Sequence, residues 1–251
     1  MSERYESIED AMRRQGEGAI FTVLKVGARR HLEELAEGHL RFRRMSFYQA
    51  EENRDQPFHD QNEGLLVVAQ ASQTQMFIEF QGKETVIPGL TGQVVIRAVL
   101  DLPVMCLFSI DCGDWVDRLV GKEDLPHMLE SMNVPPEMNK SGDTVWVIRN
   151  LEAFLLRVKA AARAQGLEMS GRRMTYIDLK RVHDQVKRED LGFVKDARFQ
   201  HEREFRIRIE PSSPLPDPFV LDVGDLRDIS TVMPLDKFRK SISLAMKPGD
   251  S

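Results

Sequence analysis

The chain has 251 residues, which is enough for one large domain or two small ones. It carries 35 Lys and Arg residues against 40 Asp and Glu residues, so its formal net charge at pH 7 is −5. A protein that coats nucleic acid or an anionic membrane needs a large basic excess, and this charge balance argues against both classes.

The sequence contains no apolar run that approaches the roughly 20 residues of a membrane-spanning helix. Its first residues, MSERYESIEDAMRR, are charged throughout and lack the apolar core of a secretory signal peptide. Two cysteines, Cys106 and Cys112, are too few for a disulfide framework. We therefore expect a cytoplasmic protein without a membrane segment.

Helices and strands alternate in the first part of the chain. The pattern predicts a helix over 3–15, a strand over 19–26, a helix over 28–37 and a strand over 39–44. Gly38 suits the position just past a helix, because glycine adopts the left-handed conformation without a Cβ penalty. In the strand over 39–44, Leu40 and Phe42 alternate with charged side chains, as in a half-buried strand.

The middle of the chain is rich in short apolar segments separated by turn residues. They predict a β-meander with strands at 64–70, 76–80, 84–87, 92–100 and 103–110. The last two segments are almost continuously apolar, which places them centrally in a sheet. Beyond them the pattern predicts one or two short helices over 114–132 and a strand over 144–149.

The final hundred residues contain the clearest helix of the sequence. Asn150 can cap a helix over 151–165, and apolar residues share one face of it. The remaining predictions are strands at 173–179, 201–209 and 219–223 and short helices at 224–229 and 234–241. Together the elements predict one α+β domain over residues 1–251, with helices packed on a curved, mainly antiparallel sheet. Residues 1–16 would form a helical arm, and 211–251 a closing strand and helices.

A long polar loop over 49–63 is the first candidate site. Its charged and amide residues are Asn53, Arg54, Asp55, His59, Asp60 and Glu63. Carboxylates beside a histidine suit acid–base work or metal binding, although the spacing matches no metal-binding motif. The alternative interpretation is a solvated loop on an acidic protein.

A charged strand over 201–209 is the second candidate site. With a period of two, Glu202, Glu204 and Arg206 would share its exposed face, and the two carboxylates would lie about 7 Å apart. One interpretation is a sheet face kept soluble by alternating charge. The other is an E-x-E pair in a cleft, where a carboxylate polarises a sugar hydroxyl and an arginine holds phosphate.

The order of these pieces resembles a broad group of uncharacterised bacterial and phage proteins, some of them linked to abortive infection. The residues that carry the resemblance are GHLRFRRMSFYQ, the polar loop that closes on Glu63 and Gly64, the spaced set Phe199, Glu202, Glu204 and Arg206, and VGDLRDI at 223–229. The layout is also similar to ADP-ribosyltransferase-like folds.

The resemblance implies a phage–host conflict protein that acts on NAD or a related nucleotide as substrate, with no tightly bound cofactor and no metal. Glu204 would stabilise the developing oxocarbenium charge, and Glu202 would orient the nucleophile. Ligand-binding roles would fall to Ser46, which the resemblance places at the second-strand serine, and to Arg206, Arg54 and Glu63. The first strand departs from the family pattern, because it offers Lys25 where an arginine or histidine is usual.

Three functions therefore stay open, and whether the protein is an enzyme stays open with them. The first is ADP-ribosyl transfer or NAD hydrolysis. The second is a non-catalytic module that binds a protein or a nucleotide, which the departure at Lys25 favours. The third is a metal-dependent nuclease or hydrolase that uses carboxylates of both candidate sites. The partners expected are a small nucleotide and a host or phage protein, whereas the net charge argues against nucleic acid and the hydropathy against a membrane.

Overall fold

The computed structural model describes residues 5–15, 20–50, 60, 63–70, 77–80, 83–86, 93–97, 101–111, 115 and 121–243. The chain divides into two compact units, each assembled from three separate segments. Unit 1 comprises Met1–Gln15, Met45–Asp101 and Met174–Gln200, and unit 2 comprises Gly16–Arg44, Leu102–Arg173 and His201–Ser251. Helices and antiparallel sheets confirm the α+β class. That the whole chain forms a single domain stays a prediction.

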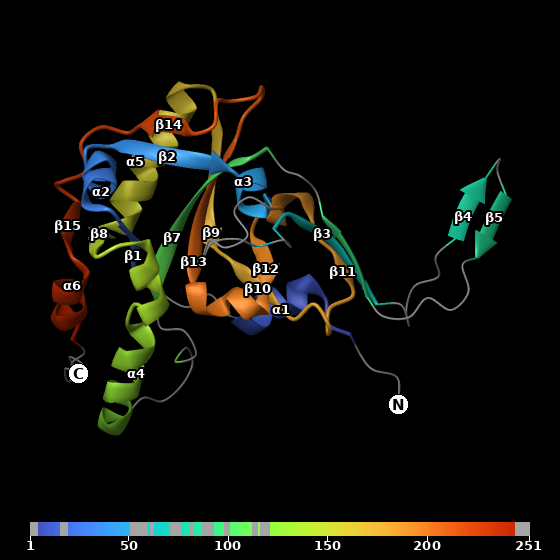
Figure 1. Ribbon diagram of the computed structural model, residues 1–251, viewed down its shortest axis with the longest axis horizontal. Helices are drawn as coiled ribbons and strands as arrows, with labels where there is room; N and C mark the ends of the chain where they lie inside the picture. Colours follow the sequence, from blue (N-terminus) through green and yellow to red (C-terminus); the bar gives the residue numbers. More distant parts are fainter. Residues whose placement is uncertain are drawn as a thin grey trace, which may run out of the picture. The chain divides into compact units, whose positions relative to one another are not determined.

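Unit 2 is built on an eight-stranded sheet in which every strand pair is antiparallel (Figure 1). Its strands are β1 (Ile20–Gly27), β2 (His39–Arg44), β7 (Pro103–Asp111), β8 (Thr144–Ile148), β9 (Glu168–Arg173), β13 (Glu204–Glu210), β14 (Phe219–Asp222) and β15 (Ser230–Pro234). Six of them follow the order β14-β2-β7-β1-β8-β15, while β13 pairs with β7 and β9. Strand β7 is thus central, as the sequence predicts.

The sheet forks along β7. The end of β7 pairs with β1, where Leu24 lies beside Phe108, and its start pairs with β2, where Arg43 lies beside Val104. Between these two pairings, the Lys25 ammonium donates a hydrogen bond of 2.9 Å to the carbonyl oxygen of Cys106. Lys25 thereby satisfies a strand carbonyl at the point where β1 and β2 separate. This contact gives the first-strand lysine a structural use.

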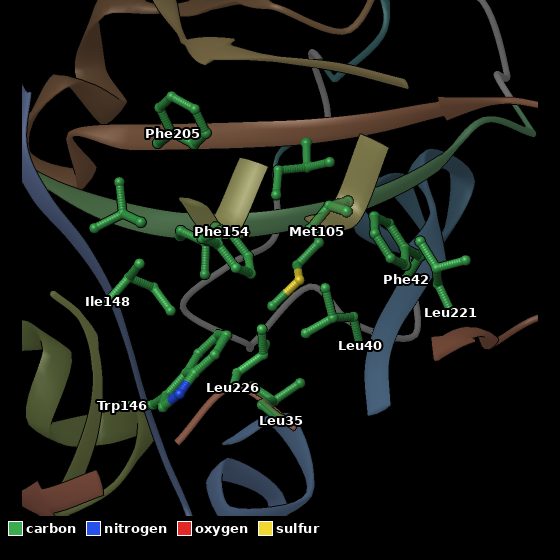
Figure 2. Packing of buried hydrophobic residues seen from close by; sticks show 14 of the residues in the cluster. Leu35, Leu40, Phe42, Met105, Trp146, Ile148, Phe154, Phe205, Leu221 and Leu226 are labelled. Carbon is green, nitrogen blue, oxygen red and sulfur yellow. The ribbon is translucent and has the colours of Figure 1, made fainter. Parts of the chain in front are cut away.

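Each face of the main sheet has its own apolar core. The helices of unit 2 are α2 (Arg29–Ala36), α4 (Leu125–Met132), α5 (Leu151–Ala164) and α6 (Leu235–Ser241), with short 3₁₀ turns η4 (Lys122–Asp124) and η5 (Pro136–Ser141). Residues of α2 and α5 pack on one face around Trp146, whose ring meets Phe154 edge-on at 5.7 Å (Figure 2). Phe238 of α6 packs on the other face with Phe108. Burial on both faces makes this sheet the structural centre of unit 2.

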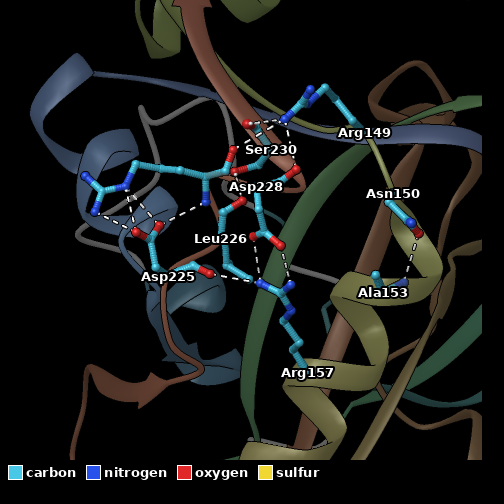
Figure 3. Close-up of polar contacts among 9 residues, drawn as sticks. Arg149, Asn150, Ala153, Arg157, Asp225, Leu226, Asp228 and Ser230 are labelled. Atoms are coloured by element: carbon cyan, nitrogen blue, oxygen red, sulfur yellow. Dashed lines mark hydrogen bonds and ion pairs between the residues drawn. The ribbon is translucent and has the colours of Figure 1, made fainter.

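Helix α5 confirms the predicted helix over 151–165. Its N-cap is Asn150, whose side-chain oxygen accepts a hydrogen bond of 3.0 Å from the backbone N–H of Ala153 (Figure 3). Phe154, Val158 and Ala162 are buried along one face, as their spacing predicts.

The predicted helix over 224–229 is wrong, because this segment is an irregular loop held by an arginine just after β8, one from α5 and one from the loop itself. Arg157 donates from both Nη atoms to the Asp228 carboxylate and also donates to the Asp225 carbonyl at 2.9 Å (Figure 3). Arg149 donates to the Asp228 carbonyl at 3.0 Å. Side chains thus satisfy backbone carbonyls that helical hydrogen bonds would otherwise occupy. Strand β15, which follows, has no counterpart among the predicted elements.

In the part of unit 1 that the structure describes, the strands form three small sheets instead of the predicted meander. Its elements are α1 (Ile8–Gln15), α3 (Met45–Gln49), β3 (Leu65–Gln70), β4 (Phe77–Phe80), β5 (Lys83–Val86), β6 (Gln93–Arg97), β10 (Thr175–Ile177), β11 (Asp184–Gln185), η6 (Arg188–Asp190), β12 (Val194–Asp196) and the 3₁₀ turn η7 (Ala197–Glu202), which ends in unit 2. Strand β3 lies between β11 and β6, β4 pairs with β5, and β10 pairs in parallel with β12.

The N-terminal helix α1 belongs to the core of unit 1. Its Ile8 and Ala11 are buried with Val68 of β3. The Asp184 carboxylate accepts a hydrogen bond of 2.8 Å from the Ile8 backbone N–H. Across the described part of the chain, no helix has the length and apolar character needed to cross a membrane.

Candidate functional site

The predicted E-x-E pair does not exist as a strand face. Strand β13 begins at Glu204, whereas Glu202 is the last residue of η7. Arg203, between them, has a φ of 41°, which lies in the left-handed region. This reversal ends the period-two alternation before the strand starts, so the expectation that Glu202 and Glu204 share one exposed face is wrong.

The charged face of β13 is buried, which also corrects the sequence prediction. Phe205, Ile207 and Ile209 lie in the apolar core, as expected. On the opposite face, the exposed fractions are 5% for Glu204, 1% for Arg206 and 4% for Arg208. Strand β13 is an interior strand, paired with β7 and β9, in a sheet that carries packed side chains on both of its faces. Buried charges need partners, and this face supplies them internally.

Glu204 and Arg206 form an ion pair on this buried face. The Glu204 Oε1 accepts a hydrogen bond of 2.6 Å from Arg206 Nε. Further along the strand, the Arg208 guanidinium pairs with the Glu210 carboxylate. The carboxylate predicted to act on a ligand is therefore neutralised by the arginine predicted to hold that ligand.

Cys106 of β7 lies directly beside Arg206 in the sheet register. Burial, followed by the negative charge of Glu204, raises the pKa of the Cys106 thiol to about 12. The thiol is hydrogen-bonded to the Glu204 carboxylate, which adds to the same shift. Cys106 is therefore a neutral thiol at physiological pH and no nucleophile, since the thiolate is the reactive form.

A pocket of about 550 Å³ opens within unit 2 beside residues 201–203, which directly precede β13. Its polar lining residues are Glu130, Ser131, Asn133, His201, Arg203 and Arg239. The apolar wall is the turn over 134–136, between α4 and η5. Glu204 pairs across the sheet with Phe108, and Phe108 shares a core with Val134 of that wall. The pocket and the Glu204 side chain are thus on the same face of the sheet.

Sequence reasoning missed this pocket. His201 and Arg203 stand in the predicted strand, but a strand over 201–209 would have placed them on its apolar face. Arg239 belongs to the predicted helix over 234–241, where a single arginine carries no signal. Residues 201–203 and α6 are distant in sequence and become neighbours only when the sheet forms, so no local sequence pattern predicts their contact with one pocket.

The candidate residues of the polar loop lie in unit 1. Ser46 is in α3, after β2 has ended, and not on the second strand as the resemblance implies. Its hydroxyl lies 3.3 Å from Asp101 Oδ1. Glu63 is buried, and its carbonyl accepts a hydrogen bond from the Gln49 side-chain amide at 2.5 Å. Arg54 is outside the described residues.

Asp60 shows that the end of this loop is not solvated. Its carboxylate is fully buried and lies 3.3 Å from Arg198 Nη2. Phe199 accepts the Arg198 guanidinium over its ring at 4.7 Å and the Lys195 ammonium at 4.8 Å. The solvated-loop interpretation is thus wrong for Asp60 and Glu63, which belong to the packed interior of unit 1.

Ser46 and Glu63 lie in unit 1, whereas Glu202, Glu204 and Arg206 lie in unit 2. Within unit 2, the structure brings Glu204 and Arg206 together and separates Glu202 from them by the turn at Arg203. Among the residues that the structure describes, no group of three or more His, Cys, Asp or Glu side chains could hold a metal ion.

Comparisons with protein-family models, curated proteins and solved structures found no match for this chain.

Proposed function

We propose that this protein is a binding module for a small nucleotide, and that unit 2 carries the binding site. The observation that carries the proposal is the state of Glu204, whose carboxylate is already bonded to Arg206 and to the Cys106 thiol. An oxocarbenium ion is stabilised by a carboxylate whose negative charge faces the sugar. The Arg206 guanidinium at 2.6 Å offsets that charge, so Glu204 is better suited to holding the sheet together.

The pocket beside Glu204 has the dimensions for such a ligand. Small-molecule sites range from about 300 to 1,000 Å³ and combine apolar walls with a few polar groups. The pocket of about 550 Å³ has an apolar turn on one side and six polar side chains around it. These features support a bound molecule with both apolar and charged parts, of which NAD and related nucleotides are examples.

Calorimetric titration of the full chain with NAD and with ADP-ribose tests this proposal. We expect both molecules to bind and NAD to remain intact, with no nicotinamide released above the rate in buffer. Glu204→Gln should lower the free energy of unfolding by about 3 kcal/mol or more, because it removes the negative charge that pairs with the buried Arg206 guanidinium. Glu202→Gln, which makes the same change outside the strand, is the matched control and should cost less.

ADP-ribosyl transfer, or NAD hydrolysis, is the second candidate. It is favoured by the position of Glu204, which follows Arg203 in the chain and shares its sheet face with the pocket. In this case wild-type protein would release nicotinamide, and Glu204→Gln would abolish the release while the melting temperature stays nearly unchanged. That pair of results would overturn the binding-module proposal.

The remaining roles rest on the resemblance alone. They are ligand contacts by Ser46, Arg54 and Glu63, a place in phage–host conflict, and a host or phage protein as partner. The proposed cytoplasmic location rests instead on the cysteine content and the charged first residues of the sequence. A metal-dependent hydrolase is not proposed, because the described residues contain no cluster of side chains that could hold a metal ion.

A further inference from the structure

Arg203 adopts a backbone conformation that residues other than glycine rarely take. Its φ is 41°, and it stands directly before β13. The conformation is fixed by β7, because the Ser109 backbone N–H donates a hydrogen bond of 2.8 Å to the Arg203 carbonyl. Residues held in such conformations concentrate at ligand sites, where the surrounding structure imposes them. The backbone conformation of Arg203 therefore makes this residue a candidate for ligand binding.

The Arg203 side chain lines the pocket, and its guanidinium also carries one buried donor that the described residues leave unsatisfied. Its Nη1 atom is buried and has no hydrogen-bond partner within the described part of the chain. The half-buried Arg203 has no carboxylate within ion-pair distance among those residues either. Buried polar groups are nearly always hydrogen-bonded, and a guanidinium nitrogen donates but does not accept. The missing partner is thus an acceptor, and a negatively charged one suits it best.

A second guanidinium lines the same pocket from α6. Arg239 donates from Nη2 to the carbonyls of Val134 at 3.1 Å and Pro135 at 3.2 Å. These bonds fix the orientation of the guanidinium plane and occupy a single nitrogen. The described residues offer no acceptor to Nε and Nη1 of Arg239, so both remain for a ligand. His201 adds an imidazole to the same lining, and Glu130 is the one acidic residue in it.

We propose that Arg203 and Arg239 form a subsite for the phosphate oxygens of a ligand, with His201 at its rim. The planar guanidinium matches a phosphate group because it can donate two parallel hydrogen bonds to two oxygens. The inference rests on the proposed function in one respect, namely that the phosphate belongs to a nucleotide. The subsite itself requires no more than a phosphate oxyanion.

Calorimetric titration of the full chain with inorganic pyrophosphate tests the subsite. Arg203→Asn removes the charge but keeps a residue that tolerates the left-handed conformation. We expect it to weaken pyrophosphate binding by about tenfold or more, since hydrogen bonds between charged groups are strong. Arg227→Gln is the matched control, because it removes an exposed arginine that pairs with Asp225 outside the pocket, and it should bind as wild type does.

Arg239→Gln provides a second variant if Arg203→Asn does not fold, and it should weaken binding in the same way. Equal affinity of wild type and the folded pocket variants for pyrophosphate would overturn the subsite, as would an equal loss in Arg227→Gln. Trp115 offers an optical readout, because its indole N–H donates at 3.0 Å to the hydroxyl of Ser131 in the pocket lining.

The same titrations with NAD and ADP-ribose separate this inference from the proposed function. Loss of nucleotide affinity in Arg203→Asn would support both. Pyrophosphate binding that depends on Arg203, without binding of either nucleotide, would support the subsite and overturn the nucleotide proposal. Nucleotide binding that is equal in wild type and Arg203→Asn would support the proposed function and overturn the subsite.

Discussion

Glu204 and Arg206 illustrate how pairing alters the meaning of a charged residue. Each alone would be costly in the interior, since a buried charge loses its hydration. Together, at 2.6 Å, they remove most of that cost and fix each other's position. Because the Glu204 carboxylate is bonded to the Arg206 guanidinium, this pair is better suited to a structural role than to catalysis. The neighbouring Arg203 presents the opposite case, a buried donor with no partner among the described residues.

Gly38 is a residue whose identity is required by the backbone. It follows α2 with a φ of 99°, and a Cβ built on it would lie 2.0 Å from the carbonyl oxygen of Gly224. We expect Gly38→Ala to lower the free energy of unfolding by more than the roughly 1–3 kcal/mol that a left-handed conformation costs a non-glycine residue, because the contact must also be relieved.

Gly166→Ala is the matched control for this experiment. Gly166 also has a positive φ, of 70°, but no atom lies within 4 Å of the position that its Cβ would take. Urea unfolding of the two variants should therefore give a small loss for Gly166→Ala and a clearly larger one for Gly38→Ala. Equal losses of stability in the two variants would contradict the close approach of the Gly38 and Gly224 backbones.

The loop over 223–230 is held by ion pairs that respond to acid. Hydrogen bonds from the Arg227 side chain lower the pKa of Asp225 from 3.8 to about 2. Hydrogen bonds from the Arg157 side chain lower the pKa of Asp228. Because the folded-state pKa of Asp225 is depressed, its contribution to stability is present above pH 3.8 and is lost as the pH falls through about 2. Both carboxylates are exposed, so the contribution is small.

An NMR titration of the side-chain carboxyl carbons measures these two pKa values separately. Arg227→Gln should return the pKa of Asp225 toward 3.8 and leave that of Asp228 low, since Asp228 takes its main bond from Arg157. Arg157→Gln should chiefly raise the pKa of Asp228. If both variants shifted both carboxyls alike, the pairing in Figure 3 would be wrong.

Elements defined by local pattern were predicted well. The strand over 39–44 and the helix that begins after Asn150 have the predicted limits to within one residue, because side-chain periodicity and a capping residue are local signals. What failed depends on distant partners. Strand β13 is paired on both edges and buried on both faces, and the loop over 224–229 is hydrogen-bonded to Arg149 and Arg157, all through residues distant in sequence. Neither could be predicted from neighbours in sequence.

The candidate site was predicted only in part, for the same reason. Glu204 and Arg206 were identified, but their mutual ion pair was not. Whether two charged side chains on a strand pair with each other or with water depends on whether that face of the strand is buried, and the local sequence does not show this. Arg203 and Arg239 were missed altogether. They share a pocket because the segment over 134–136 and α6 both pack on the same face of the sheet, the face to which the Glu204 side chain points.

At the scale of the whole molecule, the net charge of −5 limits which anions can bind. Two arginines in one pocket can attract a single phosphate group, but a polyanion requires a basic surface over many phosphates. We therefore expect no binding of a DNA duplex of about 20 base pairs at roughly 150 mM salt under conditions in which pyrophosphate binds. Fluorescence anisotropy of labelled duplex checks this, and a salt-dependent complex of micromolar affinity would contradict it.

The discontinuous make-up of unit 2 determines when it can fold during synthesis. Strands β1 and β2 are made early, yet β2 pairs with β14, where Leu40 lies beside Leu221, and β8 pairs with β15. The strands over 204–234 must therefore leave the ribosome before the sheet can close. Until then the apolar faces of β1, β2 and α2 have no permanent cover. Pairings so distant in sequence form slowly, so these apolar faces stay exposed in the nascent chain longer than those of a sheet built from local hairpins.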